Sequence, residues 1–279
     1  MQPKEKQTIS TFRNSVGQNI FYRNWKVDDR SKGIVLIIHG LNSHSGYYQN
    51  FASRLNDHDY EVYAMDLRGR GQSEGERYYI SRYEDIVADI GQIVGIVKSV
   101  HARSPIFLFG HSAGGLLASV YVVHHQDLLS GLISESCAFQ ISPSGIVEAS
   151  IKFLSHIIPH TRLLKLKNKD ISRDKSIVNM MNQDPLLANE KEPTKTMMQL
   201  LLAAQYLKKM TPAIKLPLLI LHGTADKVSA PSRSQYFLEH ASSADKQIKL
   251  YEGHYHDLLN DKYNGIVAKD IGRWLNERV

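Results

Sequence analysis

The stretch Ser104-Pro-Ile-Phe-Leu-Phe-Gly-His-Ser-Ala-Gly-Gly115 decides the fold of this 279-residue chain. Four apolar residues, Ile106 to Phe109, lead into Gly-His-Ser-Ala-Gly, and a run suited to a helix, Leu116 to Val123, follows. This order predicts a buried strand, a sharp turn and a helix, the setting in which a Gly-x-Ser-x-Gly motif presents a nucleophilic serine. Glycines on both sides of the serine leave room for a strained turn. We therefore expect Ser112 to project its hydroxyl above the edge of a sheet.

Apolar runs alternate with helical patterns on both sides of this stretch. Runs of this kind are typical of strands whose two faces are both covered by helices. An alternating segment, Thr11 to Trp25, predicts an antiparallel hairpin at the start of the sheet. Ser81-Arg82-Tyr83-Glu84 predicts a capping box that opens one of the helices. The order of elements favours an α/β protein with a mostly parallel, doubly wound sheet.

The alternation stops from residue 140 to residue 211. Two segments in this region, Ile146 to Ile158 and Thr194 to Met210, have the length and periodicity of helices. We predict that residues 140–211 form a helical cap inserted over the carboxyl edge of the sheet, and that residues 1–139 and 212–279 form the core. The alternative is that these are ordinary core helices. It is less favoured because a strand resumes directly after the segment.

Composition and charge restrict the classes of function. The net charge is +6, but the densest basic stretch, Arg162 to Lys175, also contains two aspartates. No recognition module accompanies the charge, so we expect no nucleic-acid partner. The amino terminus lacks the apolar core of a signal peptide, and no run approaches the ~20 residues of a membrane span. With its single cysteine, Cys137, the chain is expected to be cytoplasmic, and peripheral contact with a membrane is left open.

Four informative stretches fall at the ends of predicted strands. They are His39-Gly40-Leu41, Ser112, Asp226 and the segment that ends in His256. Functional loops of a doubly wound sheet gather at the carboxyl ends of its strands, so these stretches are expected to lie together. A nucleophilic serine needs a base to take its proton, and the base needs a carboxylate to fix its tautomer. The chain order serine, aspartate, histidine fits such a triad.

Spacing alone leaves the identity of the base and the acid open. His254 and His256 compete, because alternate residues at the end of a strand can point the same way. Asp245 and Asp257 are alternatives to Asp226, which directly follows a buried strand and a glycine-containing turn. The two histidines and Asp257 could suggest a metal site, but no further ligand stands at a recognisable spacing. We therefore predict no metal.

Acyl transfer also creates an oxyanion that preorganised donors must stabilise. The backbone N–H that follows the nucleophile belongs to Ala113, and the second donor is expected at Leu41 in the loop after an earlier strand. Three histidines, His39, His44 and His111, stand close in sequence to these loops. We expect them to form structural hydrogen bonds and not to act as bases.

Short motifs spread over most of the chain share one resemblance. They are His39-Gly40, His44-Ser45-Gly46, Gly71-Gln72-Ser73-Glu74-Gly75-Glu76-Arg77, Gly110-His111-Ser112, Ser172-Arg173-Asp174-Lys175, Asp184-Pro185-Leu186, His222-Gly223-Thr224-Ala225-Asp226 and Tyr251-Glu252-Gly253-His254-Tyr255-His256. The chain resembles the monoacylglycerol lipase and lysophospholipase branch of the α/β-hydrolases, grouped with the serine aminopeptidase-like hydrolases. The resemblance implies a serine esterase without cofactor, a cap that admits a single acyl chain, and His256 as the base.

Several positions depart from this family. Ser43 and Tyr47 stand where mammalian monoacylglycerol lipases carry Glu and Arg, and Leu259 stands where they carry a second histidine. Leu41 is larger than the small residue usual at its position. By the resemblance these positions line the alcohol side of the site, so recognition of the alcohol is expected to differ.

The sequence thus predicts a serine carboxylic-ester hydrolase that cleaves monoacyl lipids, either monoacylglycerol or lysophospholipid, through an acyl-enzyme on Ser112. The alternatives are a short-chain carboxylesterase, a thioesterase or a peptidase of the same fold. A more distant one is a noncatalytic protein that binds ligands on this scaffold. An aminopeptidase would need a carboxylate cluster for the substrate amine, and no such cluster is evident in the sequence. The expected partner is a small acyl ester.

Overall fold

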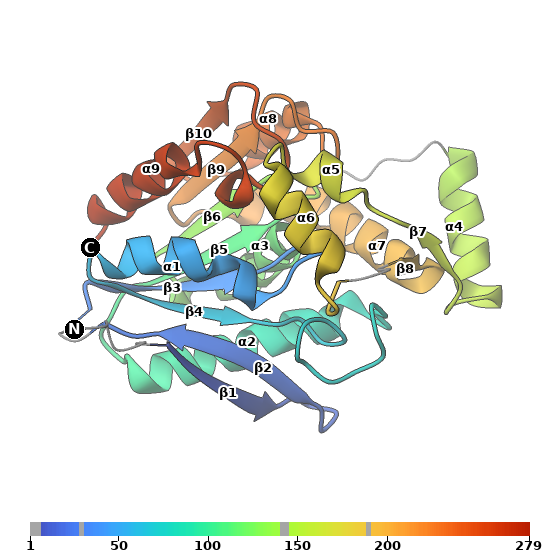
Figure 1. Ribbon diagram of the computed structural model, residues 1–279, viewed down its shortest axis with the longest axis horizontal. Helices are drawn as coiled ribbons and strands as arrows, with labels where there is room; N and C mark the ends of the chain where they lie inside the picture. The colour runs from blue at the N-terminus through green and yellow to red at the C-terminus, as the bar shows by residue number, and fades with distance from the viewer. Residues whose placement is uncertain (1–6, 28–30, 140–144, 188–190) are drawn as a thin grey trace.

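The computed structural model describes residues 7–27, 31–139, 145–187 and 191–279. One sheet of eight strands, in the order β1-β2-β4-β3-β5-β6-β9-β10, runs through the molecule (Figure 1). β1 and β2 form a hairpin, β2 pairs antiparallel with β4, and the other neighbours pair parallel. The predicted hairpin and mostly parallel sheet are confirmed. The strands are β1 (Gln7–Arg13), β2 (Asn19–Trp25), β3 (Gly33–Ile38), β4 (Tyr60–Met65), β5 (Ile106–His111), β6 (Gly131–Glu135), β9 (Leu218–Gly223) and β10 (Lys246–Tyr251).

Helices cover both faces of the sheet. α1 and α9 pack on one face, and α2, α3 and α8 pack on the other, each around its own apolar cluster. Because β3, β4 and β5 lie between these layers, all their residues are buried, which accounts for their continuous apolar runs. The helices are α1 (Gln49–Asn56), α2 (Tyr83–Val100), α3 (Ala113–His125), α8 (Pro231–His240) and α9 (Asn264–Asn276), with short 3-10 turns η1 (Ser45–Tyr48), η2 (Gln126–Leu128), η3 (Thr211–Ala213) and η4 (Leu258–Asn260).

The described part of the cap lies between β6 and β9. α7 packs against α3 of the core, and α4 packs against α7, so α4 is the outermost helix in Figure 1. The sequence predicted a helical cap. The structure adds a short antiparallel ladder of β7 and β8 to its helices. Strands this short leave no readable alternation in the sequence. The division into core and cap stays a prediction. The cap elements are α4 (Gly145–Ile157), β7 (Arg162–Leu164), α5 (Asn168–Ile171), α6 (Lys175–Gln183), β8 (Glu192–Pro193) and α7 (Thr194–Met210).

Several polar contacts tie the cap to the core, and three of them involve the loops after β3 and β4. Arg70, in the loop after β4, forms a buried ion pair with Glu192 of β8 at 2.7 Å. In the loop after β3, His44 Nε2 lies 2.9 Å from Asp184 Oδ2, and the Tyr47 hydroxyl donates to the same oxygen at 3.0 Å. Because the Arg70–Glu192 pair is desolvated, loss of either partner would leave a buried charge uncompensated. These contacts hold the cap above the carboxyl edge of the sheet.

The predicted capping box at the start of α2 is wrong. The helix begins at Tyr83 with Arg82 as its N-cap residue, and Arg82 makes no capping hydrogen bond with its side chain. Ser81 Oγ instead bonds to Asp85 Oδ2 at 3.2 Å. The N–H of Tyr83 donates to Gln199 Oε1 of α7 at 3.0 Å. An acceptor from the cap therefore takes the place of a local capping side chain, which no local motif could reveal.

The turn between β5 and α3 is tight. Ser112 has a φ of 53° and a ψ of −121°, a conformation that residues other than glycine rarely adopt. Two residues later, Gly114 packs against the end of β3. A Cβ at Gly114 would lie 2.3 Å from the carbonyl oxygens of both Ile38 and His39. The start of α3 can therefore approach β3 only because position 114 has no side chain.

Gly114→Ala is expected to lower the free energy of unfolding by about 1–3 kcal/mol, because the new methyl group would clash with backbone oxygens. Gly95→Ala in α2 is the matched control. A Cβ there meets nothing within 4 Å. This second change should raise the free energy of unfolding by roughly 0.5–1 kcal/mol through helix propensity. Urea denaturation measures both, and an equal response of the two variants would refute the close approach.

His39, at the end of β3, is buried in its neutral form. Its Nε2 accepts the N–H of Leu67 at 2.9 Å, so its Nδ1 carries the proton and donates to the carbonyl of Gly40 at 2.7 Å. Burial lowers the pKa of His39 to about 4, although the charge of Asp66 opposes the shift. This hydrogen bonding agrees with the structural role expected for His39.

The buried His39 should make the protein less stable in mild acid. Its imidazole titrates near 6.5 in the unfolded chain and near 4 in the folded one. Between these values the unfolded state binds more protons, so stability is expected to fall as the pH drops from 6.5 to 4, by up to about 1.4 kcal/mol per pH unit. His39→Gln should make this slope shallower in urea unfolding, and the remainder should come from His111, whose pKa burial also lowers to about 4. His58→Gln, at an exposed position, should keep the full slope. An unchanged slope in His39→Gln would contradict the assignment.

Candidate active site

The structure brings Ser112, His256 and Asp226 together at the carboxyl edge of the sheet. Ser112 follows β5, Asp226 follows β9, and His256 lies in the loop after β10. Ser112 Oγ lies 2.7 Å from His256 Nε2, and His256 Nδ1 lies 2.8 Å from Asp226 Oδ2. Because a carboxylate only accepts, Nδ1 carries the proton and Nε2 accepts from the serine hydroxyl. This is the geometry that nucleophilic catalysis by serine requires.

Asp226 is held as a carboxylate by its surroundings. Its Oδ1 accepts the N–H groups of Val228 at 2.7 Å and Ser229 at 3.0 Å. Burial alone would raise the pKa of Asp226, but hydrogen bonds from His222 and His256 outweigh this effect and hold the pKa well below its usual range. The carboxylate can therefore orient the imidazole of His256 and stabilise its protonated form.

His222 contacts Asp226, although the sequence analysis assigned it no role in the site. Its Nε2 lies 3.0 Å from Asp226 Oδ2, and its Nδ1 lies 2.6 Å from the hydroxyl of Ser234 on α8. The side chain is fully buried. The available signal was a His-Gly pair at the end of a predicted strand, four residues before the aspartate. That signal does not show which way the side chain points.

The other candidates for base and acid lie elsewhere. His254 is buried, and its Nδ1 contacts the carbonyl of Glu252 at 3.2 Å. Asp257 caps η4 and accepts the N–H of Asn260. Asp245 lies at the opposite edge of the sheet, just before β10. The choice that spacing left open between His254 and His256 is thus decided by the orientation of one loop.

The two predicted oxyanion donors flank the serine. Leu41 and Ala113 line the same cavity as Ser112. Within the described part of the chain, neither backbone N–H donates to another protein group. Ala113 is the first residue of α3, where N–H groups lack helical partners and the helix dipole favours negative charge. Both groups are therefore available to an anion, and their role stays a prediction.

Glu135, at the end of β6, contacts the chain segments of both the nucleophile and the base. Its carbonyl accepts the N–H of Ser112 at 2.9 Å, and its Oε1 accepts the N–H of Leu258 at 2.6 Å. Burial, with the nearby charge of Asp257, raises the pKa of Glu135 well above its usual range. The sequence gave no signal for this role, because a neutral buried glutamic acid cannot be told from an exposed glutamate.

One group of potential metal ligands occurs among the described residues. His111, Glu135 and Asp257 bring ligand atoms within 4.8 Å of one another. Two of these groups already bond within the protein, because Glu135 Oε1 accepts the N–H of Leu258 and Asp257 Oδ1 accepts the N–H of Asn260. His111 also contacts the carbonyl of His256 at 3.3 Å, in line with the structural role expected for it. We therefore assign no metal chemistry to this group.

An apolar cavity of about 280 Å³ opens at the serine and runs beneath the cap. Ser112 and His256 lie at its core end, and its apolar walls come from α4, β7, α7 and several loops. This cavity is suited to a chain of methylene groups. The apolar lining residues are Leu41, Ala113, Ala138, Ile151, Leu164, Leu166, Met197, Leu200, Leu201 and Val228.

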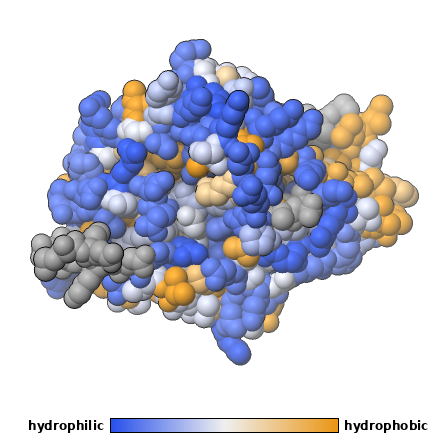
Figure 2. All heavy atoms as spheres, in the orientation of Figure 1, coloured by the Kyte–Doolittle hydropathy of each residue, from blue (hydrophilic) through white to orange (hydrophobic). Residues whose placement is uncertain are grey.

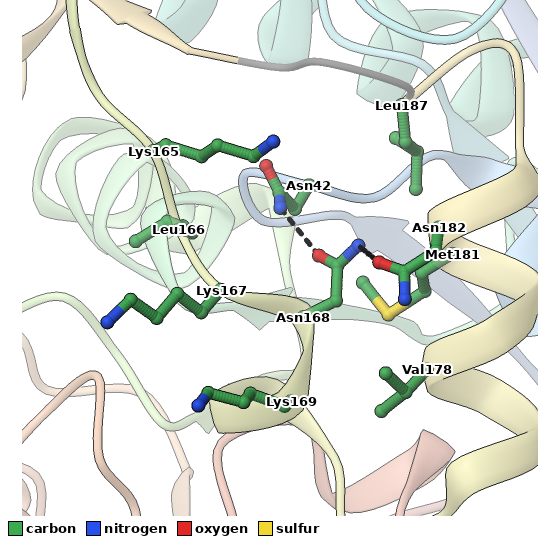
Figure 3. Close-up of a pocket in the computed structure, with 10 residues that line it drawn as sticks. All are labelled: Asn42, Lys165, Leu166, Lys167, Asn168, Lys169, Val178, Met181, Asn182 and Leu187. Carbon is green, nitrogen blue, oxygen red and sulfur yellow. Dashed lines mark hydrogen bonds between the residues drawn. The ribbon is translucent and has the colours of Figure 1, made fainter.

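A second cavity, of about 370 Å³, adjoins the first (Figure 3). Leu166 lines both cavities, and Asn42, the neighbour of Leu41, lines the second. Its walls are mostly polar or basic. They consist of Asn42, Lys165, Leu166, Lys167, Asn168, Lys169, Val178, Met181, Asn182 and Leu187.

The chain matches known proteins over most of its length. Residues 29–263 match the family described as serine aminopeptidase, S33. The chain is 32% identical to a monoglyceride lipase of Rattus norvegicus, with 95% of this chain and 89% of the relative covered. A crystal structure of a monoacylglycerol lipase from Paleococcus ferrophilus is 30% identical, with a TM-score of 0.83 over 93% of this chain and 99% of that one.

A more distant structure supports the fold alone. It is a soluble variant of monoglyceride lipase from Saccharomyces cerevisiae in complex with a substrate analog, 23% identical, with a TM-score of 0.85 over 100% of this chain and 98% of that one. The sheet, the family match and the rat relative point to the same family. The chain therefore belongs to the serine aminopeptidase S33 family and is a serine hydrolase with the α/β-hydrolase fold.

Proposed function

We propose that the protein hydrolyses the ester bond of monoacyl lipids, monoacylglycerols among them, through an acyl-enzyme intermediate. The observation that carries this proposal is the opening of the Ser112–His256 pair directly into an apolar cavity under the cap. Relatives that are monoglyceride and monoacylglycerol lipases support the same substrate class. Each methylene group moved from water into such a cavity contributes about 0.8 kcal/mol, so an acyl chain can supply much of the binding free energy.

In the proposed reaction, Ser112 Oγ attacks the ester carbonyl while His256 Nε2 takes the hydroxyl proton. Asp226 stabilises the imidazolium, and the N–H groups of Leu41 and Ala113 stabilise the oxyanion. His256 then donates the proton to the leaving alcohol. A water molecule, deprotonated by His256, attacks the acyl-enzyme and releases the fatty acid.

A peptidase is less well supported than an esterase. An aminopeptidase would need a carboxylate free to bind the substrate amine. Glu192 is the carboxylate that the described chain places in the apolar cavity, and its charge is paired with Arg70 at 2.7 Å. The cavity therefore suits an uncharged acyl chain better than an ammonium group.

The triad makes a direct prediction about two neighbouring histidines. His256→Ala and Ser112→Ala should each lower kcat for a dodecanoyl glycerol by about 10⁴-fold or more, because the nucleophile and its base act as a unit. His254→Ala should stay within about tenfold of the unchanged enzyme, because His254 has no described hydrogen bond to the triad. Fatty-acid release measures all three.

Two further measurements complete this test. A fluorophosphonate should label the unchanged enzyme and His254→Ala but not Ser112→Ala. Persistent labelling of Ser112→Ala would rule out the proposed nucleophile. Rates for acetyl, octanoyl and hexadecanoyl esters of glycerol and of p-nitrophenol should depend on acyl length. Rates that depend on neither the acyl length nor the alcohol would rule out a lipid substrate.

We also propose that α4 contacts a membrane surface peripherally, consistent with a cytoplasmic enzyme that takes its substrate from a bilayer. Figure 2 shows apolar side chains gathered at the edge where Figure 1 places α4. Ile151, on the same helix, lines the apolar cavity, so α4 connects the membrane surface with the cavity that takes the acyl chain. None of the described helices is long and apolar enough to cross a bilayer. The exposed apolar residues of α4 are Ile146, Val147, Phe153 and Ile157.

The double variant Phe153→Ser/Ile157→Ser should bind phosphatidylcholine vesicles roughly 30-fold or more weakly, because two apolar side chains, each 65% exposed, lose their insertion energy. Ile266→Ser on α9 is the matched control, since Ile266 is 54% exposed at a distant site. Vesicle flotation measures binding. Hydrolysis of p-nitrophenyl acetate should continue in both variants, and equal binding by all three proteins would rule out α4 as the contact.

A further inference from the structure

We propose that the second cavity binds the leaving alcohol and that it favours an anionic head group, a phosphate monoester or diester of glycerol. This inference rests on the proposed ester hydrolysis and narrows its substrate class.

The second cavity adjoins the cavity that contains Ser112, on the side that we assign to the alcohol. An ester held at Ser112 with its acyl chain in the apolar cavity has its alcohol on the other side of the reacting carbon. Leu166 forms a wall common to both cavities, and Leu41, the predicted oxyanion donor, is followed by Asn42 in the wall of the second. A residue that lines the second cavity, Asn42, is therefore the sequence neighbour of a residue expected at the reacting centre, Leu41. The first cavity is lined mostly by apolar residues, with Glu192, Ser229 and Arg233 as its polar members beside Ser112 and His256, so the acyl chain is the part of the substrate that it suits best.

The charge of the second cavity is positive. Lys165, Lys167 and Lys169 line it, and its lining contains no carboxylate. None of these lysines forms an ion pair with any residue that the structure describes. Asp184, the acidic residue next to α6, is hydrogen bonded to His44 and Tyr47 instead. In Figure 3, Lys165 reaches toward Asn42, whereas Lys167 and Lys169 point away from the asparagines. Lys165 is therefore expected to make the strongest contact with an anion.

A chain of amide groups supplies hydrogen-bond donors beside these lysines. Asn42 Nδ2 donates to Asn168 Oδ1 at 2.8 Å, and Asn168 Nδ2 donates to Asn182 Oδ1 at 2.9 Å (Figure 3). The bonds run in one direction and leave the amide nitrogen of Asn182 facing the cavity wall without a described acceptor. Ammonium and amide N–H groups together match the oxygens of a phosphate, which only accepts.

The alcohol side of this protein thus differs chemically from a site for neutral glycerol. Tyr47 and Leu259 replace the arginine and histidine expected from the resemblance. Tyr47 bonds to Asp184, and Leu259 is buried. The basic residues of this side are Lys165 and Lys167, between β7 and α5, and Lys169 within α5. Because the three lysines are exposed, their attraction for an anion should weaken as salt screens it.

The test compares three octanoyl esters below their aggregation concentrations, so that surface binding does not contribute. The substrates are octanoyl glycerol, octanoyl glycerol 3-phosphate and octanoyl glycerophosphocholine. Lys165→Gln should lower the ratio of kcat/KM for the phosphate ester to that for octanoyl glycerol about fivefold, the effect of one ammonium near the surface. Lys165→Gln/Lys167→Gln/Lys169→Gln should lower it further, and added salt should reduce the ratio in the unchanged enzyme. Lys98→Gln on α2 is the matched control and should leave the ratio unchanged.

A second arm separates a head-group site from a site for free phosphate. Glycerol 3-phosphate should inhibit hydrolysis of p-nitrophenyl acetate, and Lys165→Gln should weaken this inhibition about fivefold. Equal inhibition by inorganic phosphate would overturn the assignment to a head group. This arm needs no lipid substrate, so it tests the cavity even if monoacyl lipids are not hydrolysed, which would refute only the proposed function. Normal hydrolysis of octanoyl glycerol with ratios unmoved by the lysine variants would refute only this inference.

Discussion

The close approach of α3 to the end of β3 is the constraint on which the site depends. Gly114 lies so near the carbonyl oxygens of Ile38 and His39 that any side chain would displace the helix. This packing holds Ser112 at a φ of 53°, and it directs the hydroxyl toward His256. The strain at one residue is sustained because strands on both sides of β5 bury the turn. The hydroxyl of Ser112 is thus positioned by core packing.

Around this turn, buried polar groups carry their charges in a fixed pattern. Asp226 remains ionised because several donors surround it, while burial keeps His39 and Glu135 neutral. Among the described residues, Asp226 is therefore the one that brings a negative charge into direct contact with His256. Because the site has a low dielectric constant, a change in any of these protonation states would cost free energy. Glu135 also links the segments of Ser112 and His256, because its carbonyl accepts the N–H of Ser112 and its side chain accepts the N–H of Leu258.

The cap divides the space above the serine into two environments. Residues of α4 and α7 make one side apolar, and the segment between β7 and α6 makes the other side basic. Leu166 stands between them, so the ester bond would lie at the boundary between an acyl chain and its alcohol. The same scaffold can thus keep one chemistry at the triad while the cap varies the substrate.

The sequence by itself determined the strands, the elbow at Ser112 and the bounds of the helix Thr194–Met210. A strand buried on both faces leaves a continuous apolar run, and a helix buried on one face leaves a 3.6-residue period. It could not determine which contacts distant segments make. Gln199 supplies the acceptor at the start of α2, and His222 supports Asp226 from within a buried strand. His256, and not His254, meets the serine because the loop after β10 turns it there. Only the tertiary structure decided these points, since each depends on residues far apart in the chain.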